Sequence, residues 1–399
     1  MTEIEFSLIG QPSPTLQNLL ARFQDERKIS VKIRVIEWDN AWHDLLMWAL
    51  YEQGPDISHV GSTWAASLVA LNALRSFPEN EIKETGGQMA FLQPAWQSVK
   101  TTGSNAIWSM PWNTYTFLIA YRRDLLEKAG VDESIAFATA DDIKKTLQKL
   151  LVGGFQYPWV LPVGESHLDT LHYLASWVWG SGGDFITPDG HHTAFTEART
   201  FKAIESFFQL MTYMQPVDLP LVEMDALSIF TSGKAAVTIV GAGLAYEWLR
   251  NQEITQDILN TIGFAPVPGV PWIGGDNLVV WRHTRADPER ELASVALTDY
   301  LLSQSVQKAN AQSEDVGIPS RIDSLSALPL PNSQLTKVLT RSLRTGRSYR
   351  SLTSWSKIEH QFAQSLGRAG ADILKGADPS AACHNHLDTF ANWLEVSLR

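Results

Sequence analysis

The amino-acid sequence predicts an α/β protein of two domains, the first of them built on a parallel sheet. Strand and helix patterns alternate along residues 4–74, an order typical of parallel strands covered by helices. At 399 residues the chain is too long for one compact core. Hydrophobic residues make up 44% and charged residues 19% of it, a globular balance that argues against extensive disorder.

The elements of this first region follow from hydrophobic spacing and capping residues. Ser13 and Pro14 predict the start of a helix whose apolar residues recur at i, i+3, i+4 and i+7. A second helix is predicted from an N-cap at Asp39 or Asn40. Alternating or apolar runs predict the strands Ile4–Ile9, Val31–Val35 and Ile57–Val60.

Further along the chain, the segment 111–132 combines an aromatic, kinked entry, an apolar strand and a short helix capped by Asp124. Thr139 and Asp142 form a capping-box pattern before the next helix. Later signals are a strand over 235–240, a proline-dense connection over 266–271 and a helix start at 287–288.

Composition narrows the functional classes. The net charge of −11 repels phosphate backbones, so we expect no nucleic-acid partner. The chain holds 15 Trp, whose flat apolar rings with one N–H donor suit both cores and stacking on sugar faces. The single Cys383 excludes an internal disulfide. The opening MTEIEFSLIG has no basic segment, apolar run or lipobox cysteine, so we expect either a chain that begins after a removed export signal or a cytoplasmic one.

Several short segments, in their order along the chain, resemble the extracellular solute-binding proteins of ABC importers, the carbohydrate-binding class that includes maltose-binding protein. They are VIEWDNAWHDLL (35–46), GPDISHVGSTWAASLVALNAL (54–74), PWNTYTFLIAYRRDLLEKAGVD (111–132), WVWGSGGDF (177–185), FTSGKAAVTIVGAGLAYEWL (230–249), WIGGDNLVVW (272–281) and GIPSRID (317–323). The chain departs from the family pattern at one position. In the family, Asn-Gly and then a Trp often follow the strand that corresponds to residues 235–240. Here Gly241-Ala242-Gly243 stands at that position, and the next Trp is Trp248.

This resemblance implies a periplasmic-binding-protein-like type II fold of two α/β lobes that close on a ligand. Lobe I would comprise 1–112 and 266–306, and lobe II 113–265 and 307–399, with hinges near 111–116, 263–267 and 303–309. The implied function is that of a carbohydrate receptor for ABC permease subunits, monomeric, without catalysis and without a cofactor. The implied location is periplasmic or extracytoplasmic.

The resemblance and the chemistry together suggest a set of ligand-binding residues. All of them stand at the ends of elements or in loops, where binding groups concentrate. Aromatic planes and polar side chains or backbone are what a pyranose needs. Core packing or turn capping is the alternative for each of them. The candidates are Gln11, Trp38, Trp64, Trp112, Asn113, Trp179, Gly241, Trp248, Trp272, Gly274, Asp276 and Arg321.

Other functions stay open at this point. A cytoplasmic ligand sensor of the same fold is the first alternative, and a glycosidase with paired carboxylates is the second. Gly241-Ala242-Gly243 is no dinucleotide fingerprint, because Tyr246 replaces its third glycine. The cluster Cys383-His384-Asn385-His386 lacks a second ligand pair, so we expect no metal. Whether the ligand is a monosaccharide, an oligosaccharide, a polyol or another small polar molecule is open.

Overall fold

The structure is a computed structural model that describes residues 1–163, 169–216, 221–250, 256–312, 317–329 and 333–397. The chain divides into two compact units. Unit 1 comprises Met1–Tyr115, Ile273–Pro329 and Ser348–Ser356, and unit 2 comprises Thr116–Trp272, Leu330–Arg347 and Lys357–Arg399. Among the described residues, no helix is both long enough and apolar enough to cross a membrane.

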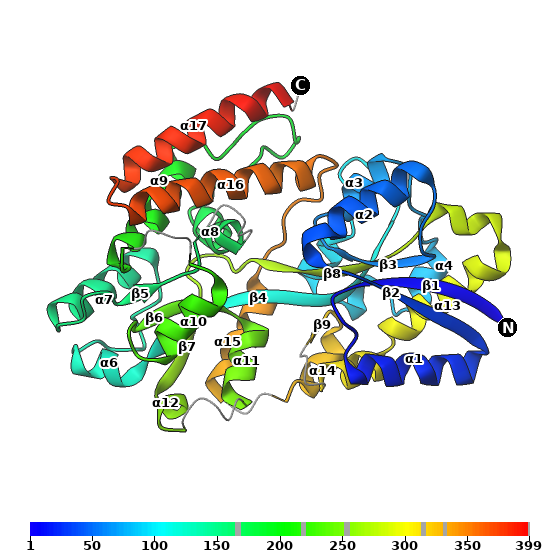
Figure 1. Cartoon of the computed structure of the whole chain (residues 1–399), viewed down its shortest axis with the longest axis horizontal. Helices are drawn as coiled ribbons and strands as arrows, with labels where there is room; N and C mark the ends of the chain where they lie inside the picture. Colours follow the sequence, from blue (N-terminus) through cyan, green and yellow to red (C-terminus); the bar gives the residue numbers. More distant parts are fainter. Residues whose placement is uncertain (164–168, 217–220, 251–255, 313–316, 330–332, 398–399) are drawn as a thin grey trace. The chain divides into compact units, whose positions relative to one another are not determined.

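Unit 1 contains a sheet with the strand order β2-β1-β3-β8-β4 (Figure 1). β1 runs parallel to both β2 and β3, whereas β8 is antiparallel to β3 and the short β9 is antiparallel to the start of β4. The strands are β1 (Thr2–Ile9), β2 (Ile29–Ile36), β3 (Ile57–Gly61), β4 (Met110–Arg122), β8 (Ile273–Val280) and β9 (Ile318–Pro319).

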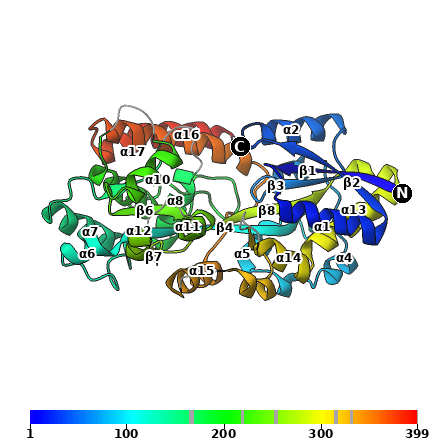
Figure 2. The ribbon, with the colours of Figure 1, turned by 60° about the horizontal axis from the view of Figure 1, so that its bottom comes forward.

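Helices cover both faces of this sheet, with α1 and α2 on opposite sides in both views (Figures 1 and 2). One core joins the apolar stripes of α1 and α13 to Ile4 and Phe6, and a second core joins α2 to Val60 and Val279. The helices are α1 (Pro14–Arg27), α2 (Trp38–Tyr51), α3 (Ala65–Ala70), α4 (Glu79–Glu84), η1 (Gln88–Ala90), α5 (Gln93–Ser98), η3 (Arg282–Ala286), α13 (Pro288–Leu302), α14 (Gln304–Ala311) and η4 (Ile322–Ala327).

The residue that caps α1 is the one predicted from the sequence, whereas the residue that caps α2 is not. Ser13 caps α1, and its Oγ accepts a hydrogen bond from the Leu16 N–H at 3.1 Å. The prediction of a cap at Asp39 or Asn40 is wrong, because α2 begins earlier and its N-cap is Glu37. Asp39 therefore lies in the first turn, where its negative charge favours the helix dipole.

The family resemblance assigns residues 266–272 to the first lobe and 307–399 to the second, whereas the structure places 266–272 in unit 2 and both 307–329 and 348–356 in unit 1. Hydrogen bonds hold both segments there. Ser320 Oγ donates to the Pro111 carbonyl at 2.7 Å, and Ser348 Oγ donates to the Pro94 carbonyl at 2.9 Å. Side-chain bonds of this kind, between residues distant in sequence, carry no local pattern from which they could be predicted.

Unit 2 is built around the second half of β4. β6 and β7 pair with it antiparallel, and β5 is parallel to β6. The strands of this unit are β5 (Trp159–Val160), β6 (Val237–Gly241) and β7 (Ile262–Pro266). Its helices are α6 (Arg123–Lys128), α7 (Ala140–Val152), α8 (Asp169–Gly180), α9 (Ala198–Gln209), η2 (Leu210–Tyr213), α10 (Glu223–Thr231), α11 (Ala242–Arg250), α12 (Gln256–Thr261), α15 (Ser333–Thr345), α16 (Trp355–Leu374) and α17 (Pro379–Ser397).

The long helices α16 and α17 lie side by side over this unit (Figures 1 and 2). Stacked rings of Phe362 and Phe390, with centroids 4.9 Å apart, join them. Thr139 caps α7 as the sequence predicts. Asp124 does not cap α6, because its two carboxylate oxygens accept from the Arg122 guanidinium at 2.9 Å and the N-cap is Arg122.

Candidate ligand-binding site

The best candidate for a binding edge in unit 1 is the carboxyl end of its parallel strands. β2 lies on one side of β1 and β3 on the other, so the strand order reverses at β1. Ligands of open α/β sheets bind outside the carboxyl ends of the strands at such a reversal. Gln11, Trp38 and Trp64 follow closely after β1, β2 and β3 respectively. Asp276 joins the same edge, since it pairs with Gly61, the last residue of β3.

Four Trp side chains and one His form what we call the aromatic cluster: Trp38, Trp42, His59, Trp64 and Trp112. The ring of Trp64 meets the rings of Trp38 and Trp42, each at a centroid distance of 5.7 Å. The imidazole of His59 stands nearly perpendicular to Trp38 at 6.0 Å and to Trp112 at 5.2 Å. Edge-to-face contacts of this kind add stability beyond the buried area and fix the rings relative to one another.

His59 connects this cluster to Asp276. The Ile9 N–H donates to His59 Nδ1 at 3.2 Å, and His59 Nε2 lies 3.1 Å from Asp276 Oδ1. Nε2 is buried and makes no well-formed hydrogen bond to a described residue, so this second contact is chiefly electrostatic. His59 is the one partner of the Asp276 carboxylate within the described part of the chain.

Solvent exposure separates the members of this group into two sets. Trp64 and Trp112 are buried, at 9% and 3% exposure, whereas Trp38 is 52% exposed. The Asp276 side chain retains 22% of its accessible surface. The half-exposed indole of Trp38 and the carboxylate of Asp276 are thus accessible to a ligand, and the buried rings of Trp64 and Trp112 support them.

The other predicted binding residues of unit 1 lie in different local environments. Gln11 is exposed in the turn after β1. Asn113 lies in β4 opposite Pro319, and its Oδ1 is buried without a hydrogen-bond partner among the described residues. Gly274 is buried in β8. Its neighbour Gly275 has a φ of 133°, and a Cβ there would come within 2.2 Å of the Asn113 carbonyl oxygen. Gly275 therefore permits the close approach of β8 and β4.

Arg321 is occupied inside unit 1. Its guanidinium donates to the carbonyls of Thr85 and Leu302 at 2.6 and 3.2 Å. It also pairs with both oxygens of Asp323 and lies over the ring of Phe91. These contacts engage the guanidinium from several sides, so the side chain ties parts of unit 1 together.

A second set of predicted residues gathers in unit 2 at the carboxyl end of β6. Gly241, the last residue of that strand, pairs with Phe117 of β4. The ring of Phe117 stacks on Trp272 at 5.5 Å and meets Tyr173 edge-on at 4.6 Å. The imidazole of His172 covers Trp272 in a nearly parallel stack, with centroids 4.0 Å apart. Trp272 is 7% exposed and is held within this aromatic group.

Two ionisable groups of α8 have shifted pKa values. Burial lowers the pKa of His172 to about 3, so the imidazole on Trp272 is neutral at physiological pH. Burial and the neighbouring charge of Glu223 raise the pKa of Asp169 to about 7. Glu223 also lines a small cavity of about 10 Å³ with Trp248, whose ring stacks on Phe230.

Trp179 lies at the other end of α8, apart from the group around Trp272. Its indole N–H donates to Asp184 Oδ1 at 3.3 Å, and the Arg347 guanidinium lies 4.7 Å above its ring. Arg347 in turn pairs with Asp184. This closed arrangement leaves Trp179 5% exposed.

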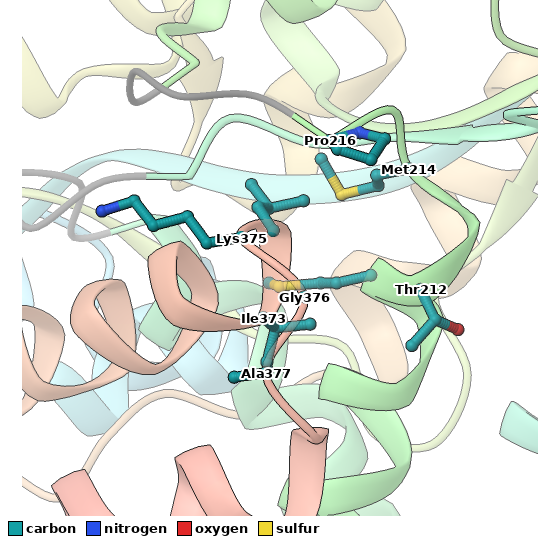
Figure 3. Close-up of a pocket in the computed structure, with 9 residues that line it drawn as sticks. Thr212, Met214, Pro216, Ile373, Lys375, Gly376 and Ala377 are labelled. Carbon is teal, nitrogen blue, oxygen red and sulfur yellow. The ribbon is translucent and has the colours of Figure 1, made fainter.

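Another cavity in unit 2 contains none of the predicted residues. A groove of about 600 Å³ lies between the end of α16 and the segment 211–216. Figure 3 shows Met214 and Pro216 on one side of it and Ile373 and Lys375 on the other. Its lining is mostly apolar and lacks the convergent polar groups that orient a small ligand.

The Cys-His-Asn-His run of the sequence lies on α17. Cys383 is buried, and burial is the main cause that raises the pKa of its thiol to about 12. His386 pairs with Asp372 at 2.7 Å, and His384 packs on Phe201. Within the described ranges no group of three or more His, Cys, Asp or Glu side chains could hold a metal ion.

Sequence reasoning missed His59, His172 and Tyr173. A signal for His59 exists, because it is a polar residue inside an apolar strand, two positions before the strand ends. His172 and Tyr173 lie in a helix whose residues from Thr170 to Trp179 are all buried, so no apolar stripe singles them out.

Comparisons with known proteins agree with the fold. The family profile described as bacterial extracellular solute-binding protein matches residues 9–308. The structure is similar to the sugar-binding protein MalE from Xanthomonas citri, with 20% identity, 100% of this chain and 97% of that chain covered, and a TM-score of 0.81. Maltose-bound MalE3 of T. maritima has 20% identity, with 99% and 100% of the two chains covered and a TM-score of 0.79.

A solute-binding protein of an ABC transporter from Thermotoga lettingae, bound with α-D-tagatose, has 18% identity, with 98% and 99% of the two chains covered and a TM-score of 0.77. No curated protein sequence matches the chain. At these identities the structural likenesses establish the fold alone, and they confirm the predicted periplasmic-binding-protein-like type II class.

Proposed function

Because the chain belongs to the family of bacterial extracellular solute-binding proteins, we propose that it is the substrate-binding receptor of an ABC importer and that its ligand is a carbohydrate. The same proposal places the protein outside the cytoplasm as a monomer, with ABC permease subunits as its partners. It assigns binding and no catalysis. The structural relatives above include proteins bound with maltose and tagatose, which supports a sugar as ligand.

The observation that carries the ligand class is that Trp38 and Asp276 both lie against His59. A pyranose presents a C–H face and a rim of hydroxyl groups, so it is bound by an aromatic plane next to a carboxylate acceptor. Trp38 is the exposed ring of the aromatic cluster, and Asp276 is held beside that cluster through His59. Both lie at the edge where the strand order reverses, which is where the fold binds ligands.

Ligand binding can be tested by intrinsic Trp fluorescence and thermal shift across a panel of neutral sugars, polyols and sugar acids. A true ligand should change the emission in a saturable way and raise the melting temperature by mass action. Trp38→Ala should abolish or strongly weaken both responses. Trp393→Ala is the matched control, because Trp393 is also partly exposed, at 37%, but lies on α17 in unit 2. Equal loss in both variants, or silence of the well-folded protein across the panel, would sink the sugar assignment.

The absence of catalysis is tested in the same samples. A sugar recovered intact by mass spectrometry after long incubation supports a receptor, and a hydrolysed sugar contradicts it. The hinge closure that the family resemblance implies stays a prediction. Small-angle X-ray scattering should show a smaller radius of gyration with ligand, and an unchanged radius would oppose closure.

A further inference from the structure

His59 lies at a buried position, where a polar side chain without partners would destabilise the fold. It lies in β3, whose five residues are all buried, and it is 5% exposed. A buried polar group in such a strand must satisfy its hydrogen-bonding atoms or destabilise the fold. Its Nδ1 accepts a hydrogen bond from the backbone of β1, whereas Nε2 lies 3.1 Å from the Asp276 carboxylate and makes no well-formed hydrogen bond to a described residue.

The partner of the first nitrogen determines the protonation of the second. Because Nδ1 accepts the Ile9 N–H, the neutral imidazole carries its proton on Nε2, the nitrogen that faces Asp276 Oδ1. Trp38 and Trp112 contact the imidazole at interplanar angles of 88° and 81°. These two rings hinder rotation of the imidazole, so the position of Nε2 is fixed.

We propose that His59 is a positioning residue of the binding edge, which holds the Asp276 carboxylate as a fixed acceptor and makes the site select neutral polyhydroxy ligands over their anionic analogues. The proposal rests on the proposed function. With Oδ1 directed at His59, the other oxygen of Asp276 has no partner among the described residues and accepts from a ligand hydroxyl. A carboxylate or phosphate at that place would meet the negative charge of Asp276 and would offer it no donor.

The affinity test compares neutral sugars with their acids, using glucose with glucuronate, galactose with galacturonate and maltose with maltobionate. The variants are Asp276→Asn, His59→Phe and His59→Gln, with calorimetric affinities for both members of each pair. Phe keeps the ring against Trp38 but removes the nitrogens, whereas Gln restores an N–H donor without the ring. His283→Phe is the matched control, because His283 is a partly buried histidine of unit 1 that stacks on Trp281.

Coupling between the two residues is the expected result. His59→Phe and Asp276→Asn should each weaken neutral-sugar binding about tenfold or more, and the double variant should be little weaker than either single variant. The preference for the neutral member should collapse in Asp276→Asn, shrink in His59→Phe and recover in part in His59→Gln. Losses that multiply in the double variant, with an unchanged ratio of neutral to acid affinity, would overturn the positioning role.

A measurement without ligand separates this inference from the proposed function. Side-chain ¹⁵N spectra of histidine-labelled protein, assigned by the signal lost in His59→Gln, should show the proton on Nε2 of His59. Asp276→Asn should shift the Nε2 signal. The opposite tautomer, or an unchanged signal, would overturn the inference even if sugars bind. If the tautomer is as expected but the wild-type protein binds neither member of any pair, the sugar receptor function fails and the selectivity inference fails with it.

Discussion

Replacing His172 by Phe should reduce the loss of folding stability that this protein undergoes as the pH falls. His172 is 8% exposed, and its imidazole stacks on Trp272 at 4.0 Å. Burial lowers its pKa from 6.5 to about 3, because the charged form would lose its hydration. Phe retains an aromatic ring against Trp272 and cannot titrate. The substitution therefore removes the protonation of this residue while it keeps the ring contact.

The sign and size of the effect follow from linkage. Between pH 6.5 and pH 3 the unfolded chain binds a proton at this residue that the folded chain does not bind. The free energy of unfolding therefore falls as the pH falls through this window, by up to about 1.4 kcal/mol per pH unit. Above pH 6.5 the contribution is fully present. Going from pH 7.5 to pH 5 should cost the wild-type protein about 2 kcal/mol through His172 alone.

Urea unfolding at several pH values between 5 and 7.5, for wild type and His172→Phe, measures this contribution. Other titrating groups are common to both proteins and cancel in the difference. A constant offset between the two curves reports effects of the substitution that do not depend on pH. The difference in unfolding free energy should change by about 2 kcal/mol across the range, in favour of the variant at low pH. Parallel curves would refute the assignment of a buried, neutral imidazole.

Three further predictions concern the other groups described above. Trp38→Ala should weaken sugar binding about tenfold in calorimetry while the melting temperature of the free protein changes little, because its ring is 52% exposed. Arg321→Ala should lower the unfolding free energy by about 2–3 kcal/mol in urea titrations, because two buried carbonyls lose their donor, and affinity should not change. Asp169→Asn should flatten the pH dependence of stability: burial raises the folded-state pKa of Asp169 to about 7, so wild-type stability falls as the pH rises from 4 to 7 and the variant should be the more stable at pH 8.

Local sequence patterns were sufficient for the first region of the fold. Capping at Ser13, the helical spacing behind it and the three short strands need only neighbours in sequence, and the structure has all of them. The cap of α2 is missed, because Glu37 makes no side-chain cap bond and two better capping residues follow it. Patterns of this kind identify elements well and place their ends less well.

The Trp residues show what composition cannot decide. Trp112, Trp179, Trp248 and Trp272 all have 7% exposure or less, whereas Trp38 is 52% exposed. Each of them stands near the end of an element or in a loop, and an indole is suited to both packing and stacking. The choice depends on which rings and cations reach it from elsewhere in the chain, as Arg347 reaches Trp179. Only the folded structure contains that information.

Asp276 also owes its position to a distant part of the chain. The family resemblance suggests this residue as a ligand contact, but the residues around it in the sequence do not predict which strand it lies beside. More than half of the chain separates β3 from β8, and hydrophobic periodicity says which face a residue occupies, not which strand lies beside it. Because β8 runs antiparallel to β3, its beginning lies against the end of β3, and Asp276 arrives opposite Gly61. A parallel β8 would have placed its beginning, and Asp276 with it, at the other edge of the sheet. The direction of this one strand brings the carboxylate to the aromatic cluster, and the buried His59 is the residue that contacts it there.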